Sequence, residues 1–134
     1  YMDYKCITNT NSLQWEYIYN SGEITVCEDG FLRTVDGYIG VAMGSYFGSI
    51  GSKYILTLDT GITIPVVKVE AKADQHTVSG FAGYVAYDII EFVIDTQATW
   101  MQENIWGNGY IFSGNFNNCE LFNGKIIAID KIIE

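Results

Sequence analysis

Residues 53–70 read KYILTLDTGITIPVVKVE, and this stretch decides the fold class. Side chains rich in Val, Ile, Tyr and Thr alternate on both sides of the central DTG, as they do in strands. A Thr-Gly pair between two such runs is a hairpin signal. The stretch therefore predicts two adjacent strands, Lys53–Asp59 and Ile62–Glu70. Pro65 inside the second run predicts that this strand lies at a sheet edge or begins with a kink.

The period of two continues through most of the chain. Five further segments carry it and are separated by turn signals: Glu23–Cys27, Tyr38–Phe47, Tyr84–Asp95, Gly109–Ser113 and Lys125–Ile132. Only Thr96–Ile105 has a helical pattern, with Trp100, Met101 and Ile105 on one apolar face. No repeat or linker interrupts these segments, and 134 residues fit one domain with a buried core. The sequence predicts one mainly-β domain over residues 1–134.

Composition excludes several classes of partner. The chain carries seven basic and sixteen acidic residues, a net charge of −9, with no basic cluster. Nucleic acid and anionic membranes are bound through clustered Lys and Arg, so neither is an expected partner. No apolar run approaches the roughly 20 residues of a membrane-spanning helix, so we expect no membrane insertion. The ten tyrosines suit a sugar- or peptide-binding groove, although β-propensity alone also accounts for them.

Three cysteines and one histidine leave little scope for a metal centre. The positions of Cys6 and Cys27 allow a disulfide, but no pair matches a zinc or redox signature, and Cys119 is left over. We therefore expect inert or buried cysteines, no cofactor and no bound metal. The chain begins at Tyr1 without a signal-like stretch, which indicates a mature secreted protein or a piece of a longer one.

The most distinctive polar break is Lys72-Ala73-Asp74-Gln75-His76-Thr77, which holds the only histidine. If the strand that begins at Ile62 extends this far, Lys72, Asp74 and His76 project to one side. A lysine beside an aspartate keeps the carboxylate ionised, and a carboxylate beside histidine favours the imidazolium. The alternative is a polar strand-to-loop transition with a surface salt bridge that contributes little to stability.

A second polar position ends the run Glu91-Phe92-Val93-Ile94-Asp95. Alternation places Phe92 and Ile94 toward the core, and Glu91, Val93 and Asp95 toward solvent or a cleft. Glu91 and Asp95 are about 13 Å apart at about 3.3 Å per residue. Paired glycosidase carboxylates are only roughly 5–9.5 Å apart. A partner for Asp95 must therefore come from another segment, and Asp74 or His76 is the natural candidate.

Four segments, taken in order, resemble a known fold: Tyr38–Gly48, Ile50–Tyr54, Lys72–Thr77 and Glu91–Asp95. Together they look like the double-psi β-barrel of the RlpA/expansin group and of the 3D (three-aspartate) domain in MltA-type lytic transglycosylases. The resemblance covers residues 38–132. It implies a six-stranded barrel with one short helix, preceded by an N-terminal extension or added strands in residues 1–37.

The aspartates of the 3D signature are partly present. Asp74 stands for the second aspartate and Asp95 for the last. Met43-Gly44 replaces the first, and Gln75-His76-Thr77 replaces a Thr-Gly-Gly turn. Gly48 to Lys53 stands where the family has a Gly-Thr turn. These matches imply cleavage of the β-1,4 glycan of peptidoglycan, or at least binding to it.

The resemblance also implies roles for individual residues. Asp95 would act as acid/base, first protonating the glycosidic oxygen and then deprotonating the sugar's attacking C6 hydroxyl, which leaves a 1,6-anhydro end. Asp74 would raise the pKa of Asp95 or stabilise the cationic centre. His76 and Thr77 would orient a carboxylate or bind a substrate hydroxyl, and Tyr46 with Trp100 or Trp106 would stack on sugar rings. The expected catalytic residues are Asp95, Asp74 and His76, and the expected substrate-binding residues are Tyr46, Lys72, Thr77 and Trp106.

Two alternatives stay open. Barrels of this kind can bind polysaccharide without cutting it, and the missing first aspartate fits such an expansin-like module. A groove on an acidic, tyrosine-rich surface can also dock a protein partner. A peptidoglycan ligand implies a secreted or cell-wall-associated protein, or one domain of a larger extracellular or phage-borne protein.

Overall fold

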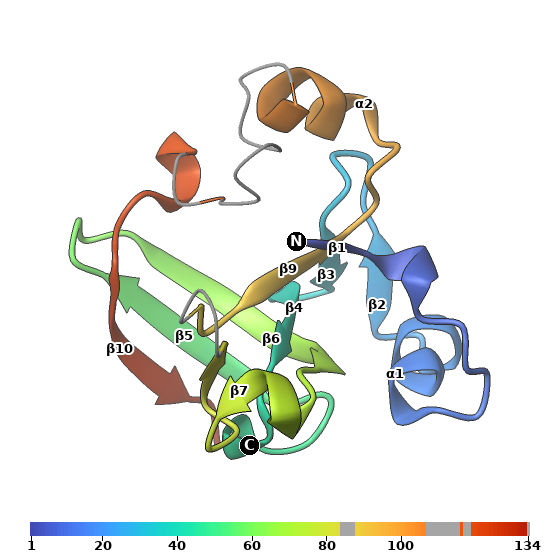
Figure 1. The fold of residues 1–134 in the computed structure, drawn as a ribbon. Coiled ribbons are helices and arrows are strands. Elements are labelled where there is room, and N and C mark those ends of the chain that lie inside the picture. Colours follow the sequence, from blue (N-terminus) through green and yellow to red (C-terminus); the bar gives the residue numbers. More distant parts are fainter. Residues whose placement is uncertain (84–87, 107–115, 117–118, 134) are drawn as a thin grey trace.

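The strands form one mixed sheet and a small hairpin (Figure 1). A computed structural model describes residues 1–83, 88–106, 116 and 119–133. Eight strands pair in one sheet and two form the hairpin, so the predicted mainly-β class is confirmed. The strands are β1 (Met2–Asp3), β2 (Ile24–Val26), β3 (Leu32–Thr34), β4 (Ile39–Met43), β5 (Lys53–Leu58), β6 (Thr63–Ala71), β7 (Thr77–Val78), β8 (Ala82–Gly83), β9 (Glu91–Ile94) and β10 (Ile126–Lys131).

The helical segments are short. α1 (Leu13–Trp15) and α2 (Thr99–Met101) each continue into a π-helical turn, η2 (Glu16–Asn20) and η5 (Gln102–Trp106). The described 3-10 turns are η1 (Tyr4–Cys6), η3 (Ser45–Phe47), η4 (Asp74–His76) and η7 (Glu120–Phe122). The helix predicted over Thr96–Ile105 is confirmed as α2 and η5, although it starts three residues later than predicted.

The large sheet has the order β1-β9-β4-β6-β5-β10, and β2 pairs with β3, which joins β4. β5 and β6 form the predicted hairpin, with Leu56 opposite Ile64. β4 runs parallel to β6 and antiparallel to β9, where Val41 is opposite Phe92. Among the described strands the order is open, from β1 at one edge to β10 at the other, and they do not close into a barrel.

Pro65 does not mark an edge strand, which corrects the first of the two alternatives predicted from the sequence, an edge strand or a kinked strand start. β6 is paired on both sides, by β4 and by β5, and Pro65 lies opposite Ile55 of β5. The β4 ladder begins only at Val66, so the missing N–H of Pro65 removes no ladder bond on that side.

Both faces of the sheet are buried at its central strands β4 and β9. One core contains Val41, Met43, Leu56, Phe92 and Ile94. The other contains Ile7, Ile18, Leu32, Val69 and Val93. Val93 was predicted to face solvent or a cleft, and that prediction is wrong. The N-terminal segment packs on the face that alternation alone leaves open, and this long-range contact has no signature in the local pattern.

Two predicted strands are shorter than expected. Tyr38–Phe47 is a strand only to Met43, because the chain turns into η3. Within Tyr84–Asp95 the described strand is β9, and residues 84–87 lie outside the described residues. The strand predicted at Gly109–Ser113 also lies outside them. In Figure 1, β9 runs from the neighbourhood of β7 at its start toward α2 at its end.

Candidate functional site

The 44–52 loop (Gly44–Ser52) connects β4 to β5 and forms one wall of the candidate site. Its backbone is attached to β6, since Gly51 N donates to Lys68 O (2.8 Å) and Lys68 N donates to Ser52 O (2.9 Å). The Lys68 ammonium donates to two more loop carbonyls, Gly44 O (3.0 Å) and Gly48 O (2.8 Å). One lysine therefore anchors both halves of the loop.

Lys68 is a buried cation beneath this loop. Lys68 is only 3% exposed. Burial lowers the pKa of its ammonium below the ordinary value of 10.5, while the carboxylates of Asp74 and Glu70 act in the opposite direction. The two loop carbonyls take the place of water as acceptors for the ammonium. Lys68 thus supplies positive charge from inside the fold, on the side of Asp74.

Asp74 lies at the surface in η4, next to the loop. Its Oδ1 accepts a hydrogen bond from Ser45 Oγ (2.6 Å). Thr77 fixes the turn, because its hydroxyl donates to Asp74 O (3.0 Å) and accepts from Gly80 N (3.1 Å). Gly80 O in turn accepts from Tyr46 N (3.0 Å). The carboxylate and the loop are therefore held together by both side-chain and backbone bonds.

The residue after Ser45 in the loop carries an exposed aromatic ring. Tyr46 is 70% exposed, and its ring meets those of Phe47 and Phe81 edge-on, with centroids 5.2 and 5.3 Å away. Phe47 and Phe81 pack against the Tyr46 ring, and most of Tyr46 is exposed, so a flat ligand face can stack on it. Tyr46 and Phe81 also line an apolar cavity of about 580 Å³ together with Ile89 and Ile127.

The expected row of Lys72, Asp74 and His76 on one strand face is not formed. β6 ends at Ala71 and the chain turns into η4, so the prediction of a shared face is wrong. Lys72 is instead occupied by Asp88, whose carboxylate and carbonyl oxygens lie 2.6 and 2.7 Å from its ammonium. His76 is exposed, and its imidazole makes no hydrogen bond to any residue that the structure describes.

Asp95 lies at the opposite end of β9 from Asp74, which corrects the expectation that the two carboxylates meet. Val41 of β4 is opposite Phe92 of β9. Ser45, the partner of Asp74, follows β4 in one direction from this pair, and Asp95 follows β9 in the other. At about 3.3 Å per residue the two ends are roughly 20 Å apart.

Local contacts occupy Asp95. Its backbone N donates to Gly30 O (2.7 Å), its Oδ1 accepts from Gln97 N (3.0 Å), and the same oxygen lies 3.8 Å from Lys5 Nζ. A carboxylate that accepts a backbone N–H two residues ahead forms an Asx turn. Asp95 therefore shapes the connection to α2, away from both Asp74 and His76.

The expected ligand-binding residues are divided between surface and interior. Tyr46 is at the surface beside Asp74, whereas the Thr77 hydroxyl is buried and bonded within its own turn. Trp100 packs on Phe31, with ring centroids 5.6 Å apart. Trp106 ends η5, and its side chain lies outside the described residues.

Sequence reasoning missed Ser45 and Lys68. Lys68 had a usable signal, because it is the one charged residue in the run ITIPVVKV at residues 62–69, and a lone charge in a buried strand needs a partner. Ser45 had none, since a serine after a glycine is ordinary turn material. We call Ser45, Tyr46, Lys68 and Asp74 the Asp74 site.

Metal ligands and disulfides do not add to this site. Within the described residues, no three His, Cys, Asp or Glu side chains are grouped so that they could hold a metal ion. Cys6, Cys27 and Cys119 are free thiols, so the Cys6–Cys27 disulfide that the sequence allows is not formed here.

Comparisons with protein-family models, with curated proteins and with solved structures found no match. In the part of the chain that the structure describes, no helix has the length and apolar character needed to cross a bilayer. Function is therefore inferred from the geometry of the Asp74 site and from the sequence resemblance.

Proposed function

We propose that this chain binds a cell-wall polysaccharide, with peptidoglycan as the expected ligand, across the Asp74 site. The observation that carries the proposal is the exposed ring of Tyr46 in the same loop as Ser45, whose hydroxyl donates to the exposed Asp74 carboxylate. Sugars present an apolar ring face and hydroxyl donors at its edge, so an aromatic surface next to a fixed acceptor is complementary to them. A protein that binds such a ligand would be secreted, associated with the cell wall or carried by a phage.

We further propose that the sheet belongs to a double-psi β-barrel of the RlpA/expansin and 3D-domain kind. The parallel pairing of β4 with β6 supports this. A second support is the 44–52 loop, which returns to β6 through Gly51 and Ser52 before β5 begins. In this arrangement Asp74 would lie at the groove of the barrel.

Cleavage of the glycan is the second candidate function. One observation favours it, because Asp74 Oδ2 makes no hydrogen bond to the described residues and is open to a ligand. A single carboxyl suffices for a lytic transglycosylase-like reaction, in which it protonates the leaving glycosidic oxygen and then takes the proton of the attacking C6 hydroxyl. Exposure of Asp74 nevertheless favours binding, since general acids of glycosidases are kept protonated by burial.

Sedimentation with insoluble peptidoglycan tests both functions at once. Wild type, Asp74→Asn, Tyr46→Ala and Asp95→Asn would be incubated with the polymer, and the soluble fraction would be analysed by mass spectrometry. We expect the wild type and Asp95→Asn to sediment and the other two variants to stay in solution. Anhydro-ended fragments from the wild type but not from Asp74→Asn would establish cleavage. Failure of folded wild type to sediment would refute the proposal and favour a protein-docking domain.

A further inference from the structure

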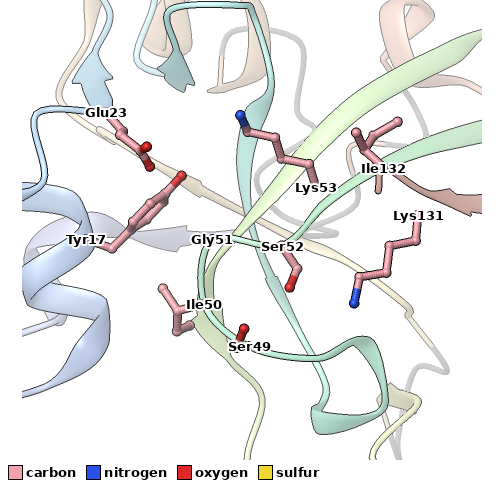
Figure 2. Close-up of a pocket in the computed structure, with 9 residues that line it drawn as sticks. All are labelled: Tyr17, Glu23, Ser49, Ile50, Gly51, Ser52, Lys53, Lys131 and Ile132. Atoms are coloured by element: carbon pink, nitrogen blue, oxygen red, sulfur yellow. The ribbon is translucent and has the colours of Figure 1, made fainter. Parts of the chain in front are cut away.

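A second cavity lies at the far end of the 44–52 loop from Ser45 (Figure 2). It has a volume of about 390 Å³ and is lined mainly by polar groups. The lining residues come from the loop itself, from Lys53 at the start of β5, from the end of β10 and from the N-terminal segment. Ser52 of the loop and Lys131 of β10 are among them, and Glu23 lines the opposite side.

Three polar side chains lie around the position that a side chain on Gly48 would occupy. An ideal Cβ on Gly48 would lie 3.3 Å from Lys131 Nζ, 3.3 Å from Ser52 Oγ and 3.7 Å from the Tyr54 hydroxyl. Gly48 has a φ of 83°, a conformation that favours glycine. The backbone thus leaves a small space that is bordered by an ammonium and two hydroxyls.

Lys131 is an exposed lysine at the end of β10. Lys5, Lys53 and Lys72 each have a carboxylate within 4.0 Å, whereas Lys131, like Lys68 and Lys125, forms no ion pair within the described residues. Figure 2 shows its ammonium turned toward the Ser52 hydroxyl, with Glu23 farther off on the other side of the cavity. In a protein of net charge −9, an ammonium without a carboxylate partner beside a hydroxyl is suited to an anionic ligand.

The apolar cavity beside Tyr46 leads to the same lysine. Lys131 and Gly48 line that cavity together with Tyr46, Phe81 and Ile127. Because Lys131 borders both cavities, a ligand that covers the Tyr46 ring can continue along the loop to the ammonium. The surface therefore offers an aromatic and apolar stretch that ends in a single positive charge.

We propose that Lys131 and Ser52, at the Gly48 turn, form a carboxylate subsite for the acidic group of the glycan whose ring lies on Tyr46. This inference rests on the proposed glycan binding. The ammonium donates to one carboxylate oxygen, and the Ser52 hydroxyl, which hydrogen-bonds to Tyr54 in the structure, turns its proton to the other. The absent Cβ of Gly48 gives the carboxylate room. A single ammonium matches the single charge of a carboxylate, which an acidic sugar or a peptide attached to a sugar can supply.

Isothermal titration with three probes tests the subsite. Chitotetraose is the neutral probe, a peptide-free N-acetylglucosamine–N-acetylmuramic acid tetrasaccharide carries its carboxylates on the sugar, and the same tetrasaccharide with stem peptides carries them on the peptide. We expect the wild type to bind at least one acidic probe about tenfold more tightly than chitotetraose, as a desolvated charge-assisted contact allows. Which acidic probe is preferred identifies the source of the carboxylate.

Variants separate this inference from the proposed function. Lys131→Gln should lose the preference for acidic probes and keep its affinity for chitotetraose, and Lys131→Arg should retain part of the preference. Lys125→Gln makes the same charge change at the exposed start of β10 and should behave as wild type. Ser52→Ala, expected to lose about threefold on the acidic probe alone, gives a second test if Lys131→Gln does not fold.

Two results would overturn the inference in different ways. Equal affinity of the wild type for neutral and acidic probes, or a preference that survives in Lys131→Gln, would remove the subsite and leave glycan binding intact. Absence of binding to all three probes by folded wild type would remove the proposed function and the subsite together.

Discussion

Carboxylates lie near both ends of β9, and their hydrogen-bond partners differ in kind. At the structural end (Asp3, Gly30, Asp95 and Thr96), Asp95 accepts from Gln97 N and Asp3 from Thr96 N, both at 3.0 Å. At the Asp74 site, an exposed carboxylate accepts from the Ser45 hydroxyl. Carboxylates bonded to backbone amides hold turns, whereas an exposed one keeps an oxygen available for a ligand. The hydrogen-bond partner therefore distinguishes Asp95, which holds a turn, from Asp74, for which we propose a role in ligand binding.

Lys68→Met should have the largest effect on this contrast. It leaves the carbonyls of Gly44 and Gly48 without their shared donor. We expect the free energy of unfolding to fall by about 2–4 kcal/mol, because an unpaired buried carbonyl costs ~1–3 kcal/mol and the hydrogen bond to Gly44 is buried, whereas the one to Gly48 is only partly buried. Urea denaturation followed by tryptophan fluorescence measures this. Lys125→Met is the exposed control, and a Lys68→Met protein as stable as that control would show that the loop is not anchored by Lys68.

Gly30→Ala probes the packing of the structural end. Gly30 has a φ of 98°, and a Cβ there would lie 2.7 Å from Met101 Cγ and 2.8 Å from Asp95 O. Gly37 has a similar φ of 90° with nothing within 4 Å of its Cβ, so Gly37→Ala reports backbone strain alone. Crowding should make Gly30→Ala about 2 kcal/mol less stable than Gly37→Ala. Equal thermal and urea stabilities would argue against a closely packed Gly30.

Asp95→Ala and Asp74→Ala should have opposite consequences. Loss of the Asx turn should lower the stability of Asp95→Ala by about 1 kcal/mol, a value typical of capping aspartates, with glycan affinity unchanged. Asp74→Ala should change stability by less than about 0.5 kcal/mol, as exposed positions do, and lose glycan binding. Denaturation and peptidoglycan sedimentation on the two proteins provide the test. A loss of binding in Asp95→Ala alone would reverse the assignment of the two ends.

Acid should weaken the structural end through Asp3. Burial acts to raise the pKa of Asp3, but hydrogen bonds from Thr96 and from Lys5 N outweigh it and hold the pKa below the ordinary 3.8. Because the folded pKa is the lower one, the stabilisation is complete above about pH 4 and is lost as the pH falls through the folded value. Denaturation between pH 2 and pH 7 should therefore show a shallower loss at acid pH for Asp3→Asn than for wild type. Identical pH profiles would contradict this role of Asp3.

The alternation of residue types predicted the hairpin correctly, but it did not predict which strand faces are covered by distant segments. Alternation in residues 53–70 predicted β5 and β6, because each strand shows its own period of two. It misjudged Val93, since the covering residues Ile7 and Ile18 lie far away in the sequence. The prediction that Pro65 marks an edge strand failed for a related reason. Whether the missing N–H of Pro65 matters depends on where the pairing with the neighbouring strand β4 begins.

The candidate site was predicted in part for the same physical reason. Asp74 was predicted from the polar break at residues 72–77, and Tyr46 from the family resemblance. The structure brings Asp74 to Ser45, the residue before Tyr46. The expected meeting of Asp74 with Asp95 depended on the register between β4 and β9, which no spacing within either segment encodes. Lys68 could have been recognised as a lone charge in an apolar strand, but its two carbonyl partners could not.

The most direct test of the Asp74 site is an NMR titration of the ¹⁵N-labelled protein with the peptide-free N-acetylglucosamine–N-acetylmuramic acid tetrasaccharide. Ligand binding should shift the backbone amides of the 44–52 loop and of residues 74–81, and leave those of Gly30, Thr96 and Gln97 in place. Shifts centred on Gly30, Thr96 and Gln97, with the 44–52 loop unchanged, would contradict the assignment of recognition to Asp74 and structure to Asp95.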